Sequence, residues 1–190
     1  MPGCDITNGR IEQCKDSVSG LKAIYFINYD ELNPDTGLTY VGATDEIDTW
    51  EPISAAIDLY KYELKGANSF ETTINSSRDN GTTFFQQTLT IQLKRQDVTT
   101  HKNVKLLAYG RPRIVVRTMT DQFFLMGLTQ GADVTAGTVS SGTALGDFNG
   151  YNLTFEAMEV SPANFLNVSN EADLATAFAY SGTDATIVTS

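Results

Sequence analysis

The sequence predicts a mainly β protein, an antiparallel β-sandwich or barrel with one packed α-helix (about 97–109) and a long β-hairpin (about 68–95). Three observations favour this class. Short segments rich in β-branched and aromatic residues recur between turn residues, as in sandwiches and barrels. One segment, starting at Phe85, alternates apolar and polar residues over its whole length. A single segment, starting at Asp97, carries clear helix start and stop signals.

The first strands are predicted from apolar segments that end at turn residues. Residues 21–27 combine β-branched and aromatic side chains, which is typical of a buried strand. Residues 33–37, Asn-Pro-Asp-Thr-Gly, form a turn because proline fixes φ and glycine allows a positive φ. Further strands are expected at 38–41, 58–65 and 70–77.

The long hairpin is predicted from a turn and the strand that follows it. Asp79-Asn80-Gly81 indicates a type I′ turn, since Asn-Gly suits two consecutive positive φ angles. The next strand, 82–95, has one apolar face and one polar face, which places Thr90 and Gln92 opposite Leu89, Ile91 and Leu93. Fully extended, it spans about 45 Å, against a diameter of roughly 40 Å for a domain of this size. The hairpin therefore either projects to reach another subunit or bends within one sandwich.

The helix is predicted by its caps. Asp97 is a good N-cap and Gly110 is placed to end the helix. Its apolar face is expected to hold Val98, Val104, Leu107 and Ala108, with His101 at the edge of that face. Later elements follow in order: strands at 112–119 and 122–128, an irregular strand plus loop at 131–142, a strand at 151–158, a short helix from Asn170 to about Tyr180, and an edge strand at the end.

The length predicts one domain with extensions. Residues 1–165 are expected to form a single β-rich domain with an N-terminal extension (1–20), and 166–190 a C-terminal extension that contains the short helix. Hydrophobic residues make up 41% of the 190, which is enough for a core. Neither a membrane-length apolar run nor a secretory signal is evident, so synthesis in a cytoplasm is expected.

The sequence is poor in residues that carry catalysis, so the protein is not expected to be an enzyme. It has one histidine, His101, which lies in a polar run and is expected at the surface. No phosphate-binding loop and no metal-ligand spacing is present, so no catalytic residue, cofactor or metal is predicted. Cys4 and Cys14 lack a CxxC spacing and are expected to be free, non-catalytic thiols.

Charge is unevenly distributed along the chain. Residues 1–70 carry a net charge of −7, residues 71–120 of +5 and residues 121–190 of −8, which gives −10 in total. Two interpretations stay open. In the first, folding disperses these charges over an ordinary surface; in the second, the basic segment 71–120 contacts acidic surface from residues 121–190 on a neighbouring subunit. On the second reading, reversing Arg111 and Arg113 leaves the subunit folded and weakens its assembly.

The order of elements resembles a known family. After the helix come Leu106-Leu107-Ala108-Tyr109-Gly110-Arg111, two short strands, and the sequence Gly-Thr-Ala-Leu-Gly-Asp-Phe-Asn-Gly-Tyr-Asn-Leu-Thr-Phe at 142–155. Over about residues 1–165 the chain resembles small structural proteins of tailed bacteriophages, and its architecture is similar to that of tail tube proteins. That resemblance implies a sandwich with one flanking helix and a long hairpin. It also implies homo-oligomeric rings, commonly hexameric, that stack into a tail tube through which DNA passes.

The resemblance implies a virion location, in the tail, and partners that are copies of the same chain and other tail proteins. DNA is expected to transit without specific binding, because a net charge of −10 repels phosphate. Two alternatives stay open: a capsid decoration or head–tail connector protein, and a carbohydrate-binding β-sandwich in which Trp50 and the eight tyrosines form a stacking platform. The residues expected at subunit contacts are Arg78, Asn80, Phe84, Arg111 and Arg113.

Overall fold

The computed structural model describes residues 8–12, 15, 17–42 and 44–189, and it is mainly β as predicted. The elements are β1 (Leu21–Ile27), the 3-10 helix η1 (Tyr29–Glu31), β2 (Leu38–Tyr40), β3 (Ile47–Trp50), β4 (Asp58–Glu63), β5 (Ser69–Ser77), β6 (Thr82–Lys94), α1 (Val98–Tyr109), β7 (Arg113–Thr118), β8 (Phe123–Met126), β9 (Asp133–Ser140), β10 (Gly150–Glu159), β11 (Asn164–Phe165), α2 (Glu171–Ala177) and β12 (Thr186–Val188). The described part of the N-terminal extension is exposed and lies outside any helix or strand. Cys4 and Cys14 fall outside the described residues.

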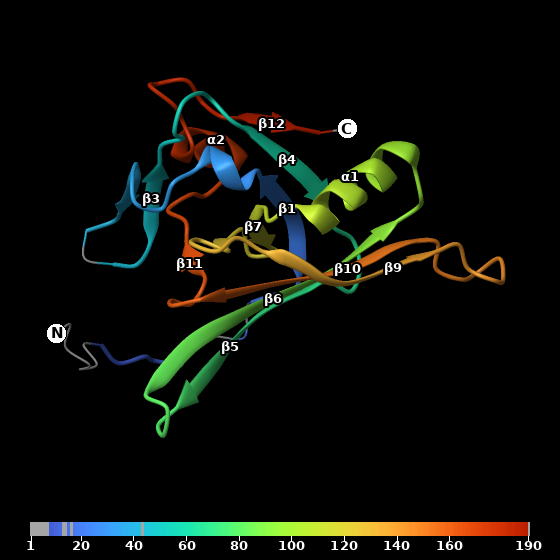
Figure 1. Cartoon of the computed structure of the whole chain (residues 1–190), viewed down its shortest axis with the longest axis horizontal. Helices are drawn as coiled ribbons and strands as arrows, with labels where there is room; N and C mark the ends of the chain where they lie inside the picture. The colour runs from blue at the N-terminus through green and yellow to red at the C-terminus, as the bar shows by residue number, and fades with distance from the viewer. Residues whose placement is uncertain (1–7, 13–14, 16, 43, 190) are drawn as a thin grey trace.

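Two sheets pack face to face, so the sandwich prediction is confirmed (Figure 1). One sheet has the order β11-β8-β7-β1-β4-β12, and the other has the order β5-β6-β10-β9. The apolar core between them includes Ile24 and Phe26 of β1, Leu89 and Ile91 of β6, and Phe155 of β10. Successive side chains of a strand point to opposite faces of its sheet, so every second residue of each strand contributes to the core between the two sheets.

The six-stranded sheet is buried on its other face as well. There it packs against the small β2–β3 sheet and α2, in a second core that includes Tyr25 and Ile27 of β1 with Trp50 of β3. Both faces of β1 are therefore covered, which explains why every one of its residues except Lys22 is buried. A strand buried on both faces carries a nearly continuous apolar sequence, and β1 does.

The C-terminal segment 166–190, predicted as an extension that contains a short helix, packs on the sandwich. Leu166, Leu174 and Phe178 are buried in the second core. β12 extends the six-stranded sheet by pairing in parallel with β4, which confirms the expected edge strand. The short helix ends at Ala177. A segment of this length is too short to form a hydrophobic core of its own. Its apolar side chains are therefore buried against the sandwich, and this contact holds the segment in place.

The caps of α1 are those predicted. The Asp97 side chain accepts a hydrogen bond from the Thr100 backbone N–H, and the Gly110 N–H donates to the Leu106 carbonyl. The predicted apolar face is only half right. Val104 and Leu107 pack against the core, whereas Val98 is 89% exposed and Ala108 is exposed, because the apolar face of α1 that meets the sandwich is narrower than predicted.

The turn of the long hairpin differs from the prediction. Ser77 pairs with Thr82, so four residues connect the strands, and among them only Gly81 has a positive φ, 62°. The type I′ assignment is wrong because a four-residue connection needs a positive φ at one position and not at two. β3 and β11 were not expected from the sequence, since each is short and pairs with a short neighbour.

The apolar face of β6 is largely as predicted. Leu89 and Ile91 are fully buried, Leu93 is half-buried, and Thr90 is exposed. Gln87 lies on the same face and is buried, because its Oε1 accepts from the Gly127 N–H at 3.0 Å. A buried amide is tolerated when it is hydrogen-bonded in this way.

We expect Ile91→Ala to lower the free energy of unfolding by about 2 to 5 kcal/mol, since it removes buried methyl groups and leaves a cavity between the sheets. Urea denaturation measures this loss. The matched control is Thr90→Ala, at the exposed neighbouring position, which should stay within about 0.5 kcal/mol of the wild type. A loss below roughly 0.5 kcal/mol for Ile91→Ala would mean that this face does not pack against the other sheet.

Candidate assembly surfaces

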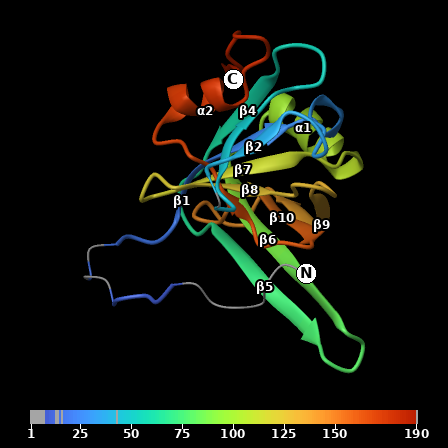
Figure 2. The ribbon, with the colours of Figure 1, turned by 90° about the vertical axis from the view of Figure 1, so that its left-hand side faces the viewer.

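The hairpin β5–β6 projects beyond the body of the molecule (Figures 1 and 2). We call residues 71–84 the arm; none of them is buried. β10 pairs with β6 only from Phe85 onward, so the last part of the arm has no neighbouring strand other than its own partner. A long paired segment of this kind has too little apolar contact within the subunit to be part of its core.

Polar pairs hold the arm together. The hydroxyls of Ser76 and Thr83 lie 2.9 Å apart, and the Asn75 amide donates to Gln86 at 3.5 Å. Two large apolar side chains nevertheless stand on it, with Ile74 66% exposed and Phe84 38% exposed. Isolated exposed apolar residues are common, but on an arm that leaves the body they are placed to meet another chain.

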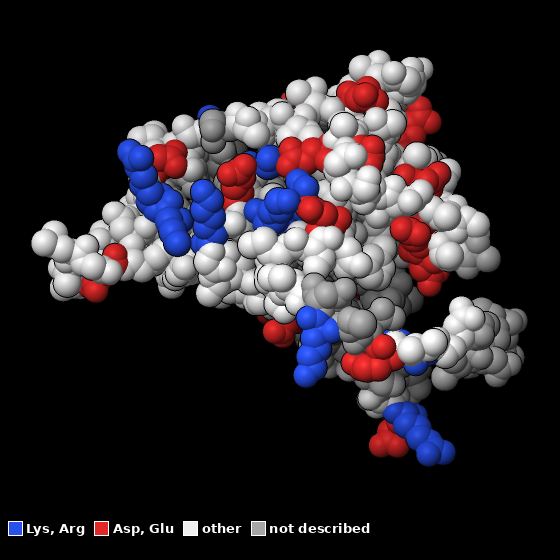
Figure 3. All heavy atoms as spheres, turned by 180° about the vertical axis from the view of Figure 1, so that it is seen from behind, with Lys and Arg blue, Asp and Glu red and all other residues white. Residues whose placement is uncertain are grey.

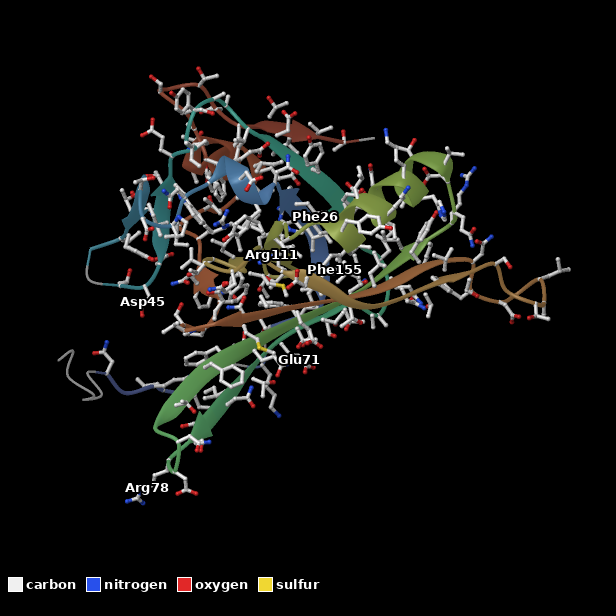
Figure 4. All side chains as sticks on the ribbon, in the orientation of Figure 1. Phe26, Asp45, Glu71, Arg78, Arg111 and Phe155 are labelled. Carbon is white, nitrogen blue, oxygen red and sulfur yellow. The ribbon has the colours of Figure 1, made fainter. Side chains whose placement is uncertain are left out.

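Three of the predicted contact residues lie together on the arm. Arg78 and Asn80 are in its turn, where Figure 4 labels Arg78 at the far end, and Phe84 is on its β6 strand. All three are exposed. The structure therefore brings them to one surface, and their role in contacts stays a prediction.

The four-stranded sheet has two open edges. β5 and β9 are its outer strands, and their residues are mostly exposed. Neither strand contains proline or lysine, the residues that commonly protect an edge from pairing. Among the described residues no further strand pairs with either edge. The Ser140 carbonyl of β9 accepts from the Gln96 amide, and the β9–β10 register shifts once along the strand, so it is the rest of each edge that is open to pairing with another chain.

Arg113 does not lie on a surface, so its assignment to a subunit contact is wrong. It is fully buried, and its guanidinium donates to three carbonyl oxygens, those of Leu128 at 3.0 Å, Tyr29 at 2.5 Å and Leu32 at 3.1 Å. It also lies over the rings of Tyr29 and Trp50, at 4.3 and 4.9 Å from their centroids. Burial lowers the pKa of Arg113, yet arginine stays charged in proteins.

Arg111 is exposed but already occupied within the subunit. Its guanidinium donates to the Gln130 carbonyl at 2.6 and 3.1 Å and lies 5.1 Å from the centre of the Tyr29 ring. A side chain held in this way offers fewer free donors to a neighbour than an unbound one. Its role at a subunit contact stays a prediction.

Part of the charge pairing between the basic segment and the last third of the chain occurs inside the subunit. Arg117 pairs with Asp121 at 2.6 Å and with Glu171 at 2.9 Å. Lys61 pairs with Glu171 at 2.8 Å, and Lys22 with Asp121 at 3.0 Å. Burial alone raises the pKa of Glu171, but hydrogen bonds from Lys61 and Tyr25 outweigh it and hold that pKa below its ordinary value.

Trp50 cannot form a stacking platform. It is fully buried, and its indole N–H donates to the Asn33 carbonyl at 3.0 Å. The carbohydrate-binding alternative, which was based on Trp50 and the eight tyrosines, therefore loses its tryptophan. The aromatic surface that could still serve it is a cleft of about 510 Å³ between α1 and the six-stranded sheet, which the sequence did not predict. Its lining includes Phe26, Tyr29, Tyr60, Tyr62 and Leu107.

Features of other functional classes are few in the described part of the chain. His101 is exposed, as expected, and lies 6.2 Å from the Tyr151 ring centre to centre. Among the described residues, no group of three or more His, Cys, Asp and Glu side chains could hold a metal ion. Within the same residues no helix has the length and hydropathy required to cross a membrane.

Comparison with known protein families, with curated proteins and with solved structures finds no match to this chain. The resemblance to tail tube proteins therefore stays a prediction.

Proposed function

We propose that this protein is a structural protein of a tailed-phage virion that assembles into rings, and that the rings, commonly hexameric in the family it resembles, stack into a tail tube for DNA. Its partners are copies of itself and other tail proteins, and its place is the virion tail. On this proposal it is not an enzyme and uses no cofactor.

The observation that carries the proposal is the four-stranded sheet with two open edges and a projecting arm. The β5 edge of one subunit and the β9 edge of the next have complementary free main-chain groups. Contacts between two different surfaces of the same chain close into a ring when the rotation between subunits permits. The arm, none of whose residues is buried, is then available for a contact with the neighbouring subunit or ring.

The charge supports passage of DNA rather than a grip on it. The net charge is −10, and three of the basic side chains, Lys22, Lys61 and Arg117, are paired with carboxylates inside the subunit. Specific or non-specific DNA binding relies on basic groups that neutralise several phosphates. An acidic conduit instead repels phosphate and lets DNA slide.

Removal of the arm tests the proposal. Replacing residues 75–84 with Asn-Gly joins Ile74 to its register partner Phe85 through a two-residue hairpin turn. No residue removed is buried, so we expect the variant to unfold cooperatively and close to the wild-type midpoint. We expect stacked rings or striated tubes from the wild type in negative-stain electron microscopy, and at least a tenfold loss of such particles from the variant.

Two outcomes would contradict the proposal. If the shortened variant forms the same tubes as the wild type, the arm has no part in assembly. If the wild type is seen only as monomers or trimers that bind to capsids, the protein is a decoration or connector protein instead.

A further inference from the structure

One end of the molecule is acidic. We call residues 35–51, which hold β2, β3 and their connecting loops, the acidic lobe. It contains no Lys or Arg, and indeed none occurs from residue 23 to residue 60. Four of its five carboxylates are exposed, and the fifth, Glu46, is half-buried. The carboxylates of the lobe are those of Asp35, Asp45, Glu46, Asp48 and Glu51.

The other end is basic. Lys65, Lys94 and Arg95 line one hollow between the ends of β4 and β6 and the start of α1, and Lys102 and Lys105 stand on α1 itself. All five are exposed. We call them the basic end. Two acids lie near it: Asp97, which caps α1, and Glu63, whose carboxylate pairs with Lys61.

The two surfaces do not meet within one subunit. Figure 4 labels Asp45 toward one end of the longest axis, and α1 lies toward the other end. In Figure 3 one group of blue side chains lies on the left of the view with a few red ones beside it, whereas the upper right of the view shows red side chains without blue neighbours; further blue side chains lie at the centre and the bottom. The ion pairs of the described residues join Lys22, Lys61 and Arg117 to Glu63, Asp121 and Glu171, and none of them involves the acidic lobe or the basic end.

The carboxylates of residues 121–190 fit less well as the partner of the basic end. Asp121 and Glu171 are paired inside the subunit. Glu159 is buried and accepts from two backbone N–H groups, of Thr129 and Gln130. Asp147 is bound to the N–H groups of its own loop, those of Thr143 and Ala144. The acidic lobe instead has four exposed carboxylates on one short segment, and those of Asp48 and Glu51 each accept one hydrogen bond from a neutral group, of Asn167 and Ser181.

We propose that the acidic lobe of one subunit docks against the basic end of the next, so that the contact is head-to-tail and sets the direction of the ring. In a ring each subunit presents one surface to its neighbour on one side and a different surface to its neighbour on the other, so opposite charges at opposite ends of the chain fit such a contact. A two-fold axis through either surface would place like charges against each other, which is unfavourable. An antiparallel pair, in which each acidic lobe meets the other copy's basic end, would stop at a dimer, and sedimentation distinguishes that dimer from larger particles. This inference rests on the proposed function only in requiring that the chain assembles with itself.

Charge reversal and charge exchange test it. Lys102→Glu with Lys105→Glu makes the basic end acidic, and Asp35→Lys with Asp45→Lys makes the acidic lobe basic. At about 10 mM salt, where screening is weak, we expect each double variant to raise the protein concentration needed for particle formation by at least tenfold. A chain that carries both pairs regains opposite charges across the contact and should assemble within about threefold of the wild type. Sedimentation velocity measures all three.

The control separates this contact from a simple change in net charge. Arg10→Glu with Lys15→Glu changes the net charge as much as the basic-end variant, yet lies outside both surfaces. It should assemble like the wild type, and thermal melts should show all variants folded. If the wild type assembles and the two reversed variants assemble no worse than the control, the head-to-tail contact is wrong and self-assembly stands. If the wild type does not assemble at any salt concentration, the proposed function fails and this inference fails with it.

Discussion

Replacing Arg113 with Met is expected to lower the free energy of unfolding by about 3 to 5 kcal/mol. The Met side chain fills much of the same space but has no donors, so the carbonyls of Leu128, Tyr29 and Leu32 lose their partner inside the protein. A buried acceptor left without a hydrogen bond costs about 1 to 3 kcal/mol. The packing of the guanidinium on two aromatic rings is lost as well.

Urea denaturation measures the free energy of unfolding of Arg113→Met and of the control variant Arg111→Met. Arg111 is exposed and bonded to a single carbonyl, so we expect its loss to cost about 1 kcal/mol or less. If the two variants lose the same free energy of unfolding, the buried guanidinium of Arg113 does not stabilise the segments of Tyr29, Leu32 and Leu128 whose carbonyls it binds.

The same geometry changes what the reversal of Arg111 and Arg113 can report. Arg113→Glu would bury a carboxylate against three carbonyl oxygens, which is more costly than leaving the carbonyls unpaired. The double reversal is therefore expected to unfold the subunit, contrary to the expectation from the sequence that it stays folded. Charge reversal informs on assembly only at exposed positions such as Lys102 and Lys105.

The burial of Arg113 could not be read from the sequence. Residues 112–119 were predicted as a strand, and β7 occupies Arg113–Thr118. A charged residue at the start of a strand is ordinarily exposed. The carbonyls that bind this one come from residues 29–32 and from Leu128, so only the packing of distant segments makes its burial favourable.

Elements with a strong local signal were predicted well. The alternation along β6 and the caps Asp97 and Gly110 of α1 depend on residues close in the chain. β3 and β11 have no such signal. They exist because they pair with β2 and β8 and complete the cover of the second core, and this depends on the fold as a whole.

The candidate surfaces were predicted in part. The length of the segment 82–95 suggested a projecting hairpin, and the arm does leave the body. The acidic lobe does not stand out in the net charge of residues 1–70, because the stretch 23–60, which has no Lys or Arg, is flanked there by Arg10, Lys15, Lys22, Lys61 and Lys65. The lobe is distinct only once β2 and β3 are known as elements. The basic end is assembled from β4, β6 and α1 and needs the fold.

Replacing Trp50 with Ala is expected to cost about 3 to 5 kcal/mol, the usual loss for a large aromatic side chain in a core. Trp50 is fully buried between β2–β3 and the six-stranded sheet. Its removal opens a cavity there, deletes the hydrogen bond to the Asn33 carbonyl and exposes one side of Arg113. Trp50→Phe keeps an aromatic ring in the site and should lose less than Trp50→Ala. Guanidinium denaturation compares the two.

The two largest losses should not add. Trp50 and Arg113 are in contact, with the guanidinium 4.9 Å from the indole ring centre, and residues in contact commonly show coupling of about 0.5 to 3 kcal/mol. Once Trp50 is absent, Arg113 has already lost one of its packing surfaces, so its own replacement removes less. We therefore expect Trp50→Ala with Arg113→Met to lose less than the sum of the single variants, measured as a double-mutant cycle. Strict additivity would mean that the tryptophan fills space beside the arginine without stabilising it.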